Sequence, residues 1–267
     1  MDDFFQGVKS MLGLSLAARN NIDFRPTDIF LVSYPKSGNT WLRNLIANLV
    51  YHGQELDIEA IDKYVPDVYK TRQYKLRAMT GRRYLKSHEY FDDRYKCVIN
   101  VVRDPRDVCV SYYFYLKKNY AISDEMGIDD FCKIFVNGEV DNFSSWSEHV
   151  GSWASINKNS KKYLLVRYED IRLRPMELIS EVASFVGVDV SAGGALHIIS
   201  EKISFESMKE AEKKSEKKWK EVANTRSDIM FMRQGISGGW VDHLSEESVR
   251  LIEDTFRKEM KEYGYIE

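Results

Sequence analysis

The sequence lacks the features that define several protein classes. Its 267 residues include only three cysteines and five prolines, and its formal net charge at neutral pH is −2. Such a small net charge argues against a protein whose main partner is a nucleic-acid backbone, although it is compatible with a local basic pocket. No apolar run approaches the roughly 20 residues that a membrane-spanning helix needs. There is also no proline-rich linker and no internal repeat, so nothing in the sequence divides the chain.

The few cysteines and histidines are scattered. Three cysteines without CxxC spacing indicate reduced thiols in a reducing compartment. The histidines have no histidine partner four residues away and no neighbouring cysteine cluster, so we expect no metal site. Charged residues at Asp2, Asp3 and Lys9 interrupt the first apolar stretch, which argues against a secretory signal. We therefore expect a cytoplasmic protein that needs no metal.

Short apolar runs bounded by turn residues alternate with helical patterns along the chain. This alternation predicts an α/β fold, a single domain over residues 1–267 with a central, mainly parallel sheet flanked by helices. The strands are expected at Ile29–Ser33, Tyr84–Lys86, Cys97–Val102 and Tyr163–Val166. The clearest helices are expected at Asn39–Tyr51, from Asp104-Pro105 onward, at Pro175–Val186 and at Ser245–Tyr263.

Two helical segments carry further local signals. The last helix begins with "SEES" at Ser245, which is typical of a capping box. The segment Lys209–Glu221, "KEAEKKSEKKWKE", is a run of charges and predicts a solvated helix or a loop.

The stretch "IFLVSYPKSGNTWLRNLI" joins a buried strand to an amphipathic helix through a polar turn. Gly38 can adopt backbone angles that a side chain forbids, so the amides of the turn can converge on the start of the helix. Free N–H groups and the helix dipole attract phosphate there, and Lys36 adds a cation. The lysine precedes the glycine, unlike in G-x-x-x-x-G-K-[ST], which suits a nucleotide 5′-phosphate. The structural alternative is a capped helix start.

The segment "NVVRDPRDVCVSYYF" repeats this arrangement after another strand. Arg103 leaves the strand at its carboxyl end, where ligands bind in open α/β sheets, and Ser111 follows about two helical turns later. Together they can hold a second phosphate. In the alternative interpretation Arg103 pairs with Asp104 or Asp107.

Two more segments carry candidate functional groups. In "YLKSHEYF", Lys86 and His88 lie on the same face of a short strand, and histidine is the usual general base near neutral pH. In "FMRQGISGGW", Arg233 stands beside glycines whose amides can wrap a phosphate. Taken singly, each segment has an alternative interpretation. His88 can be a structural histidine, and "FMRQGISGGW" can be a surface loop.

In this order, together with "VRYEDIRLRP" and "SFESMK", the segments resemble the cytosolic sulfotransferases that use 3′-phosphoadenosine 5′-phosphosulfate (PAPS). The resemblance covers roughly residues 28–243 and implies PAPS as the sulfuryl donor and adenosine 3′,5′-bisphosphate (PAP) as the product. It implies that the 5′-phosphosulfate is held by Lys36, Ser37, Gly38, Asn39 and Thr40. It implies that the 3′-phosphate is held by Arg103, Ser111, Arg233, Gln234 and Gly235. It implies that the adenine is lined by Trp41, Tyr168, Ser204 and Phe205.

The resemblance also implies a reaction without a metal. His88 would act as the base on a hydroxyl or amine of a small-molecule acceptor, while Lys36 and Lys86 neutralise developing charge. Two alternatives are a P-loop kinase acting on a small molecule and a non-catalytic protein that binds adenine nucleotides. The kinase would need a magnesium-binding aspartate on a strand, which the sequence does not clearly offer.

The sequence departs from the family pattern at its last motif, Arg-Lys-Gly-x-x-Gly-Asp-Trp-Lys. Gln234, Gly239 and Val241 replace a lysine, an aspartate and a second lysine, so donor affinity could be lower. The following "VDHLSEESV" lacks the pattern through which many relatives dimerise, which indicates a monomer or a weak dimer. We expect neither nucleic acid nor a membrane as a partner.

Acceptor selection is expected from two segments between the motifs. These are Ile61–Arg83, rich in tyrosine and basic residues, and Phe114–Trp153, rich in aromatics. Their aromatic side chains can wall a pocket for a small molecule or simply pack in the core.

Overall fold

The computed structural model describes residues 22–51, 56–154, 160–191, 194–215, 219 and 222–267. The N-terminal charges that argue against a secretory signal lie outside these residues. None of the helices in the described part is both long and apolar enough to cross a membrane. The three cysteines are free thiols.

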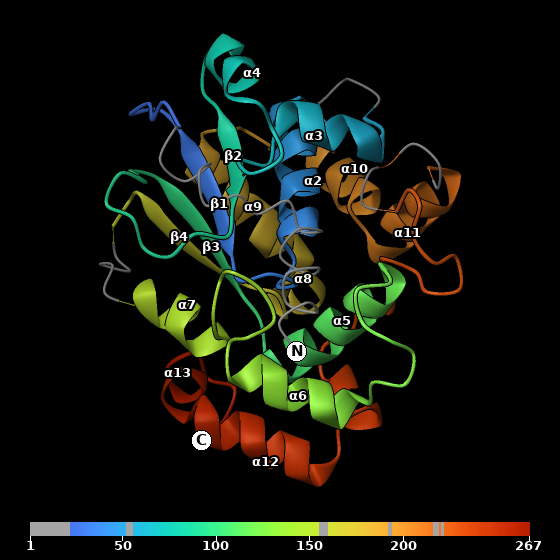
Figure 1. The fold of residues 1–267 in the computed structure, drawn as a ribbon. Helices are drawn as coiled ribbons and strands as arrows, with labels where there is room; N and C mark the ends of the chain where they lie inside the picture. The colour runs from blue at the N-terminus through green and yellow to red at the C-terminus, as the bar shows by residue number, and fades with distance from the viewer. Residues whose placement is uncertain (1–21, 52–55, 155–159, 192–193, 216–218, 220–221) are drawn as a thin grey trace.

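A four-stranded, fully parallel sheet forms the centre of the fold, with the strand order β2-β1-β3-β4 (Figure 1). The strands are β1 (Ile29–Ser33), β2 (Tyr84–Ser87), β3 (Val98–Val102) and β4 (Tyr163–Arg167). Their predicted positions agree to within one residue, and the predicted α/β class is confirmed. The chain places β2 on one side of β1 and β3 on the other, so the strand order reverses between β1 and β3.

The sheet buries both faces because its strands are apolar at nearly every position. Side chains alternate between the two faces of a strand, so Ile29 and Leu31 of β1 pack with one cluster while Phe30 and Val32 pack with another. The first cluster joins the sheet to the helices α2 (Asn39–Val50) and α9 (Pro175–Val186). The second contains the stacked ring of Tyr95, whose centroid lies 3.7 Å from that of Phe30.

Helices cover the sheet and extend the molecule beyond it. In Figure 1, α5, α6 and α12 follow one another from the centre toward the bottom, and they enclose a third apolar cluster. The helices are α2 (Asn39–Val50), α3 (Ile61–Tyr64), α4 (Gln73–Ala78), α5 (Pro105–Lys118), α6 (Ile128–Val136), α7 (Trp146–Ser152), α8 (Asp170–Leu173), α9 (Pro175–Val186), α10 (Ala195–Lys202), α11 (Phe205–Lys214), α12 (Glu246–Thr255) and α13 (Arg257–Glu262). Two 3-10 turns, Ile58–Ala60 and Gly239–Asp242, complete the described elements.

The prediction of one continuous final helix was wrong. The helix breaks at Phe256, whose φ of −106° and ψ of 17° are not helical, and α13 follows in a new direction. Phe256 is fully buried and packs against Trp146 and Phe135. Burial of this ring, which the local sequence pattern does not reveal, accompanies the break.

The predicted capping signals are partly confirmed. Asp104 caps α5 by accepting a hydrogen bond from the Arg106 N–H at 2.9 Å, with Pro105 at the first helical position. Ser245 caps α12 by accepting a hydrogen bond from the Ser248 N–H. Ser248 has no carboxylate that could accept the Ser245 N–H in return, so "SEES" forms a simple cap and not a capping box. A true capping box starts α7, where Ser145 and Glu148 bond to each other's backbone.

A buried ion pair joins the residue before β2 to the residue before β1. The Arg83 guanidinium lies 2.6 Å from the Asp28 carboxylate, and neither side chain is exposed. Desolvating both charges is costly, and the pair is tolerated because each group is hydrogen-bonded by the other. Removing one partner leaves an uncompensated charge in the interior.

We therefore expect Arg83→Met to lower the free energy of unfolding by about 3–5 kcal/mol. Arg250→Met is the matched control, because Arg250 pairs with Glu246 on the surface, where such pairs contribute about 1 kcal/mol or less. Urea denaturation of both variants measures the difference. Equal losses would show that burial of the Arg83–Asp28 pair has no special energetic role.

Candidate functional site

The candidate site lies where the order of the parallel strands reverses. The loop after β1 begins at Tyr34 and the loop after β3 begins at Arg103, and the two strands are direct neighbours. In open α/β sheets the crevice at such a reversal is the usual ligand site, because the two loops diverge there. The fold thus brings together two motifs that lie about 65 residues apart in the sequence.

The loop after β1 has the backbone of an anion-binding turn. Lys36 and Gly38 have positive φ angles of 66° and 101°, and Gly38 is the N-cap of α2. A Cβ atom on Gly38 would lie 2.5 Å from the Tyr168 ring, so glycine is required both by the angle and by the close approach of that ring. The first free N–H groups of the twelve-residue helix α2 follow directly.

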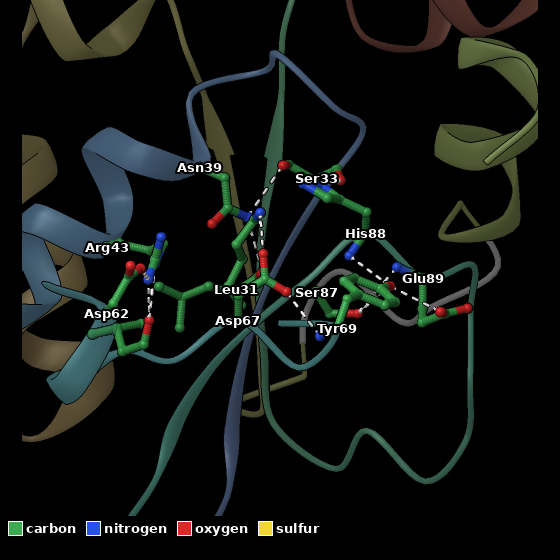
Figure 2. Close-up of polar contacts among 12 residues, drawn as sticks. Leu31, Ser33, Asn39, Arg43, Asp62, Asp67, Tyr69, Ser87, His88 and Glu89 are labelled. Atoms are coloured by element: carbon green, nitrogen blue, oxygen red, sulfur yellow. Dashed lines mark hydrogen bonds and ion pairs between the residues drawn. The ribbon is translucent and has the colours of Figure 1, made fainter. Parts of the chain in front are cut away.

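The polar side chains of this loop are used in different ways. Asn39 turns back to β1 and donates from Nδ2 to the Leu31 carbonyl at 3.0 Å and to Ser33 Oγ at 3.2 Å, as Figure 2 shows. The sequence-based expectation that Asn39 offers a side-chain donor to phosphate is therefore not supported by these contacts. Ser37 is buried and its Oγ has no hydrogen-bond partner. Thr40 and Trp41 line the cavity described below.

The side chain of Arg103 is buried, and its close contacts are with an aromatic ring and two carbonyl groups. Its guanidinium carbon lies 4.0 Å from the centroid of the Tyr168 ring. Nη1 donates to the Lys36 carbonyl at 3.2 Å and Nη2 to the Ile236 carbonyl at 3.3 Å, while the buried Nε has no partner. Asp104, one of its proposed partners, instead pairs with Arg106 at 2.6 Å.

The other proposed partner of Arg103 fixes the glycine-rich loop. Asp107 accepts the Gly238 N–H at 2.8 Å and the Trp240 N–H at 3.0 Å. This carboxylate on α5 thereby holds the loop over the start of the helix that carries Ser111.

The loop 231–236 brings a second arginine next to Arg103. Arg233 lies 4.4 Å from the Phe114 ring centroid, and its Nη1 is 3.0 Å from Nε2 of His243. Burial, with the nearby charge of Arg103, lowers the pKa of Arg233. Two guanidiniums close enough for their charges to interact favour an anion beside them.

Gly235 and Gln234, two further residues of this loop, have surroundings that agree with a ligand-binding position. Gly235 has a φ of 60°, and a Cβ atom there would meet the Phe205 ring at 2.2 Å. The buried Gln234 Oε1 has no hydrogen-bond partner. Arg103 Nε and Gln234 Oε1 are thus unpaired polar atoms of cavity-lining residues, which fits a polar ligand in contact with these side chains.

A cavity of about 580 Å³ is lined by residues of the loop after β1, the loop after β3 and the glycine-rich loop. Its lining includes the sequence-predicted residues Lys36, Gly38, Asn39, Thr40, Trp41, Lys86, His88, Arg103, Ser111, Tyr168, Ser204, Phe205, Arg233, Gln234 and Gly235. Ser37 is the predicted site residue that is not part of the lining. The volume is in the range of pockets for small ligands.

The ring of His88 is oriented by the backbone of β1. His88 Nδ1 lies 2.6 Å from the Ser33 carbonyl oxygen. Because a carbonyl can only accept, Nδ1 carries the proton and Nε2 keeps its lone pair. The Tyr69 hydroxyl accepts a hydrogen bond from the His88 backbone N–H at 3.1 Å and donates one to Glu89 at 2.8 Å (Figure 2). Phe143 packs edge-on against the imidazole.

The two predicted lysines have different surroundings. Lys86 Nζ lies 2.6 Å from Oδ2 of Asp67, a residue that sequence reasoning did not single out. Lys36 Nζ lies 3.9 Å from the ring centroid of Tyr115 and 4.3 Å from that of Phe231. The Lys36 ammonium group is thus held over aromatic faces.

Several residues of the site were not predicted from the sequence, because their role depends on contacts with residues distant in the chain. Glu212 belongs to the charge run that was expected to be solvated, yet it is only 2% exposed. Its two carboxylate oxygens accept the Phe231 and Met232 N–H groups at 2.6 Å each, which anchors the loop that carries Arg233. The prediction of a solvated segment was wrong at this position. Its remainder between residues 216 and 221 lies largely outside the described residues.

Both segments predicted to select the acceptor contribute to the cavity. Asp67, Tyr69 and Lys70 line it from the first segment, and Tyr115 and Phe143 line it from the second. In the described part of the chain, no three histidine, cysteine, aspartate or glutamate side chains gather as metal ligands would.

Comparison with known proteins adds to this geometry. A family model described as "Sulfotransferase domain" matches residues 26–264. The chain belongs to the sulfotransferase family. Human sulfotransferase 1C2 is 26% identical over 260 residues, covering 90% of this chain and 86% of the relative. The predicted family and sulfotransferase activity are confirmed, and neither alternative function is favoured.

Solved sulfotransferase structures agree with the fold. Mouse sulfotransferase SULT7A1, complexed with PAP, has a TM-score of 0.73 at 27% identity and covers 94% of this chain and 92% of that chain. A retinol dehydratase complexed with androsterone and inactive cofactor PAP has a TM-score of 0.75 at 22% identity, covering 90% and 82%, and supports the fold alone. PAPS, the predicted donor of this sulfotransferase, is consistent with the PAP in the mouse relative.

A second histidine lies in the interior near His88. His149 is fully buried, its ring packs edge-on against Tyr34 and Tyr90, and neither ring nitrogen has a hydrogen-bond partner. Burial lowers its pKa to about 3. Since the unfolded chain protonates this group near pH 6.5, the unfolded state binds more protons between these two pH values.

Stability from His149 is thus fully present above about pH 6.5 and falls as the pH decreases toward 3. The free energy of unfolding of the wild type should decrease between neutral pH and about pH 5. We expect His149→Phe, which keeps an aromatic ring, to make this decrease smaller by about 2 kcal/mol. Urea denaturation across this pH range measures the slope of the free energy of unfolding against pH. The exposed His197 provides the control His197→Gln, which should leave the slope unchanged, and an unaltered slope in His149→Phe would contradict this assignment.

Proposed function

We propose that this sulfotransferase transfers a sulfuryl group from PAPS to a hydroxyl or amine of a small molecule, with His88 as the general base. The observation that carries this proposal is the hydrogen bond between His88 Nδ1 and the Ser33 carbonyl. It leaves Nε2 as the proton acceptor in a cavity whose lining also includes three lysines and four arginines.

The donor half of the proposed site has two anion-binding ends. At one end, the amides that begin α2, together with Lys36, Ser37, Gly38 and Thr40, would hold the 5′-phosphosulfate. At the other end, the 3′-phosphate would be held by Arg103, Ser111, Arg233, Gln234 and Gly235. Trp41, Tyr168, Ser204 and Phe205 would line the adenine. The Gln234 Oε1 atom is an acceptor, so a contribution of Gln234 to an anion comes from its N–H groups.

PAPS supplies an activated sulfuryl group whose leaving group is a stable phosphate, so no metal is needed. In the acceptor half, His88 Nε2 removes the proton of the attacking hydroxyl or amine. The Lys36 and Lys86 ammonium groups neutralise negative charge on the transferring oxygens. Such preorganised charges are commonly the largest contribution to catalysis.

A small-molecule acceptor fits the walls of the cavity. The rings of Tyr69 and Phe143 lie against His88, and Tyr115 adds a further aromatic ring to the lining of the same cavity. These observations support a compact acceptor that is flat over part of its surface.

Three wider predictions accompany this function. Residues 1–267 form one sulfotransferase domain, of which the family match spans residues 26–264. The protein is cytoplasmic, and it is a monomer or a weak dimer without nucleic-acid partners. These statements rest on the sequence arguments given above.

The role of Arg103 leads to a direct binding test. Arg103→Ala should weaken PAP binding by about 1.5–3 kcal/mol, because a charged hydrogen bond is lost. Isothermal titration calorimetry with PAP measures this change. Arg174→Ala, which removes an arginine paired on the surface with Asp170 and Glu181, is the control. Unchanged PAP affinity in Arg103→Ala would refute the 3′-phosphate role.

The role of His88 leads to a kinetic test. His88→Ala should lower kcat about 10²–10⁴-fold, because the base is lost, while PAP affinity is retained. Burial and the charge of Lys86 lower the pKa of His88, so the imidazole stays neutral below about pH 6.5. The acid limb of kcat/KM should therefore lie below that pH. Assays of radiolabelled sulfuryl transfer across a panel of phenols, alcohols and amines give both measurements. Transfer by His88→Ala at the wild-type rate would exclude this base.

A further inference from the structure

A carboxylate lies in the acceptor half of the cavity, beside the reacting groups. The segment 66–68 runs along β2, with the Lys86 N–H donating to the Pro66 carbonyl at 2.9 Å and the Val68 N–H donating to the Lys86 carbonyl at 3.1 Å. Asp67 is thereby the direct cross-strand partner of Lys86. Paired residues of neighbouring strands project from the same face. Asp67 and Lys86 both line the cavity, together with His88.

The Asp67 carboxylate keeps hydrogen-bonding capacity after its contacts within the protein. Oδ2 accepts from Lys86 Nζ at 2.6 Å, and Oδ1 accepts from the Tyr69 N–H at 2.8 Å. An ionised carboxylate offers about four lone-pair positions on its two oxygens. Roughly two of them therefore remain, although the side chain is only 5% exposed.

The charges around Asp67 determine which ligand suits those lone pairs. Burial raises the pKa of this carboxyl, but the cations Lys86, Lys70 and Arg43 outweigh burial and hold the pKa far below its usual value, so the group is ionised. The same three cations repel a further positive charge. A neutral hydrogen-bond donor is thus favoured over an ammonium group.

We propose that Asp67 selects acceptors that carry a second, neutral hydroxyl group close to the hydroxyl that is sulfated. This inference rests on the proposed function and names its acceptor class as dihydroxylated aromatic compounds. The aromatic part follows from the rings of Tyr69, Tyr115 and Phe143 in the cavity lining. The second hydroxyl donates to Asp67 while the first faces His88 Nε2.

The strand places the two recognition groups in the same part of the cavity. Lys86 and His88 are alternate residues of one segment, and alternate residues of a strand lie about 6.6 Å apart. Asp67 is opposite Lys86, so Asp67 and His88 line neighbouring parts of the cavity. Suitable acceptors for a test therefore carry two hydroxyl groups on adjacent or next-adjacent carbons of one ring. A compound with a methoxy group in place of the second hydroxyl leaves Asp67 desolvated without a donor.

The test measures acceptor binding to the full-length protein saturated with PAP, in which no sulfuryl transfer takes place. Catechol and resorcinol are titrated by calorimetry beside their monomethyl ethers, guaiacol and 3-methoxyphenol. We expect at least one diol to bind about 10-fold or more tightly than its ether. 2-(Aminomethyl)phenol, which places an ammonium group near the hydroxyl, should bind no more tightly than guaiacol.

Variants at one position identify the group responsible. Asp67→Asn keeps the size of the side chain and an oxygen for the Tyr69 N–H, and it should reduce the diol-to-ether ratio. Asp67→Ala should reduce that ratio to about 2 or less, the statistical factor for two hydroxyls. Asp62→Asn is the control, because Asp62 pairs with Arg43 at 2.6 Å and does not line the cavity. This control should keep the wild-type ratio.

The possible outcomes separate this inference from the function on which it rests. PAP binding by every variant shows that the fold and the donor site are intact. A ratio near 2 in the wild type, no binding of either diol, or an unchanged ratio in both Asp67 variants would overturn the selection by Asp67. Sulfuryl transfer to other acceptors would then still support the proposed function. Failure of the wild type to bind PAP would instead overturn the proposed function itself.

Discussion

The parallel pairing of β1 with β3 is the constraint on which the site depends. Because the two strands are hydrogen-bonded in the same direction, their carboxyl ends lie together, and the loops that leave them carry Lys36 and Arg103 into one crevice. The Arg103 side chain reaches the Lys36 carbonyl only because of this pairing. The pairing of β2 with the other edge of β1 then brings the backbone of Ser33 to His88. Donor and acceptor halves thus share one strand.

The cations of the site make close contacts with aromatic rings and carbonyl groups, and the Asp107 carboxylate acts on both arginines at longer range. Arg103 stacks on Tyr168 and donates to two carbonyls, Arg233 lies over Phe114, and Lys36 lies between two aromatic rings. Aromatic faces and carbonyls orient a cation without neutralising its full charge. These side chains are therefore positioned in advance for an anionic ligand, with little reorganisation on binding. Lys86 differs, because the Asp67 carboxylate compensates its charge on the acceptor side.

Buried carboxylates organise the backbone around these cations. Glu212 accepts the N–H groups of Phe231 and Met232, and Asp107 accepts those of Gly238 and Trp240, which follow the loop with Arg233. Both side chains are almost fully buried, so breaking these bonds would leave charged oxygens without partners. The glycine-rich loop is thereby held against α5 and α11. The acidic residues contribute to anion recognition indirectly, by fixing the loop geometry.

The four strands, the starts of α2 and α5 and the family could be predicted from the sequence, because periodicity, caps and the Lys36–Gly38 turn are local signals. Arg103 and His88 were also identifiable as candidates. The hydrogen bonds of Asn39 to β1, the break of the last helix at Phe256 and the burial of Glu212 became visible in the fold. The pairing of Asp67 with Lys86 belongs to the same group. Each of these depends on a partner distant in the chain, and the burial of a polar or aromatic group against such a partner leaves no local pattern.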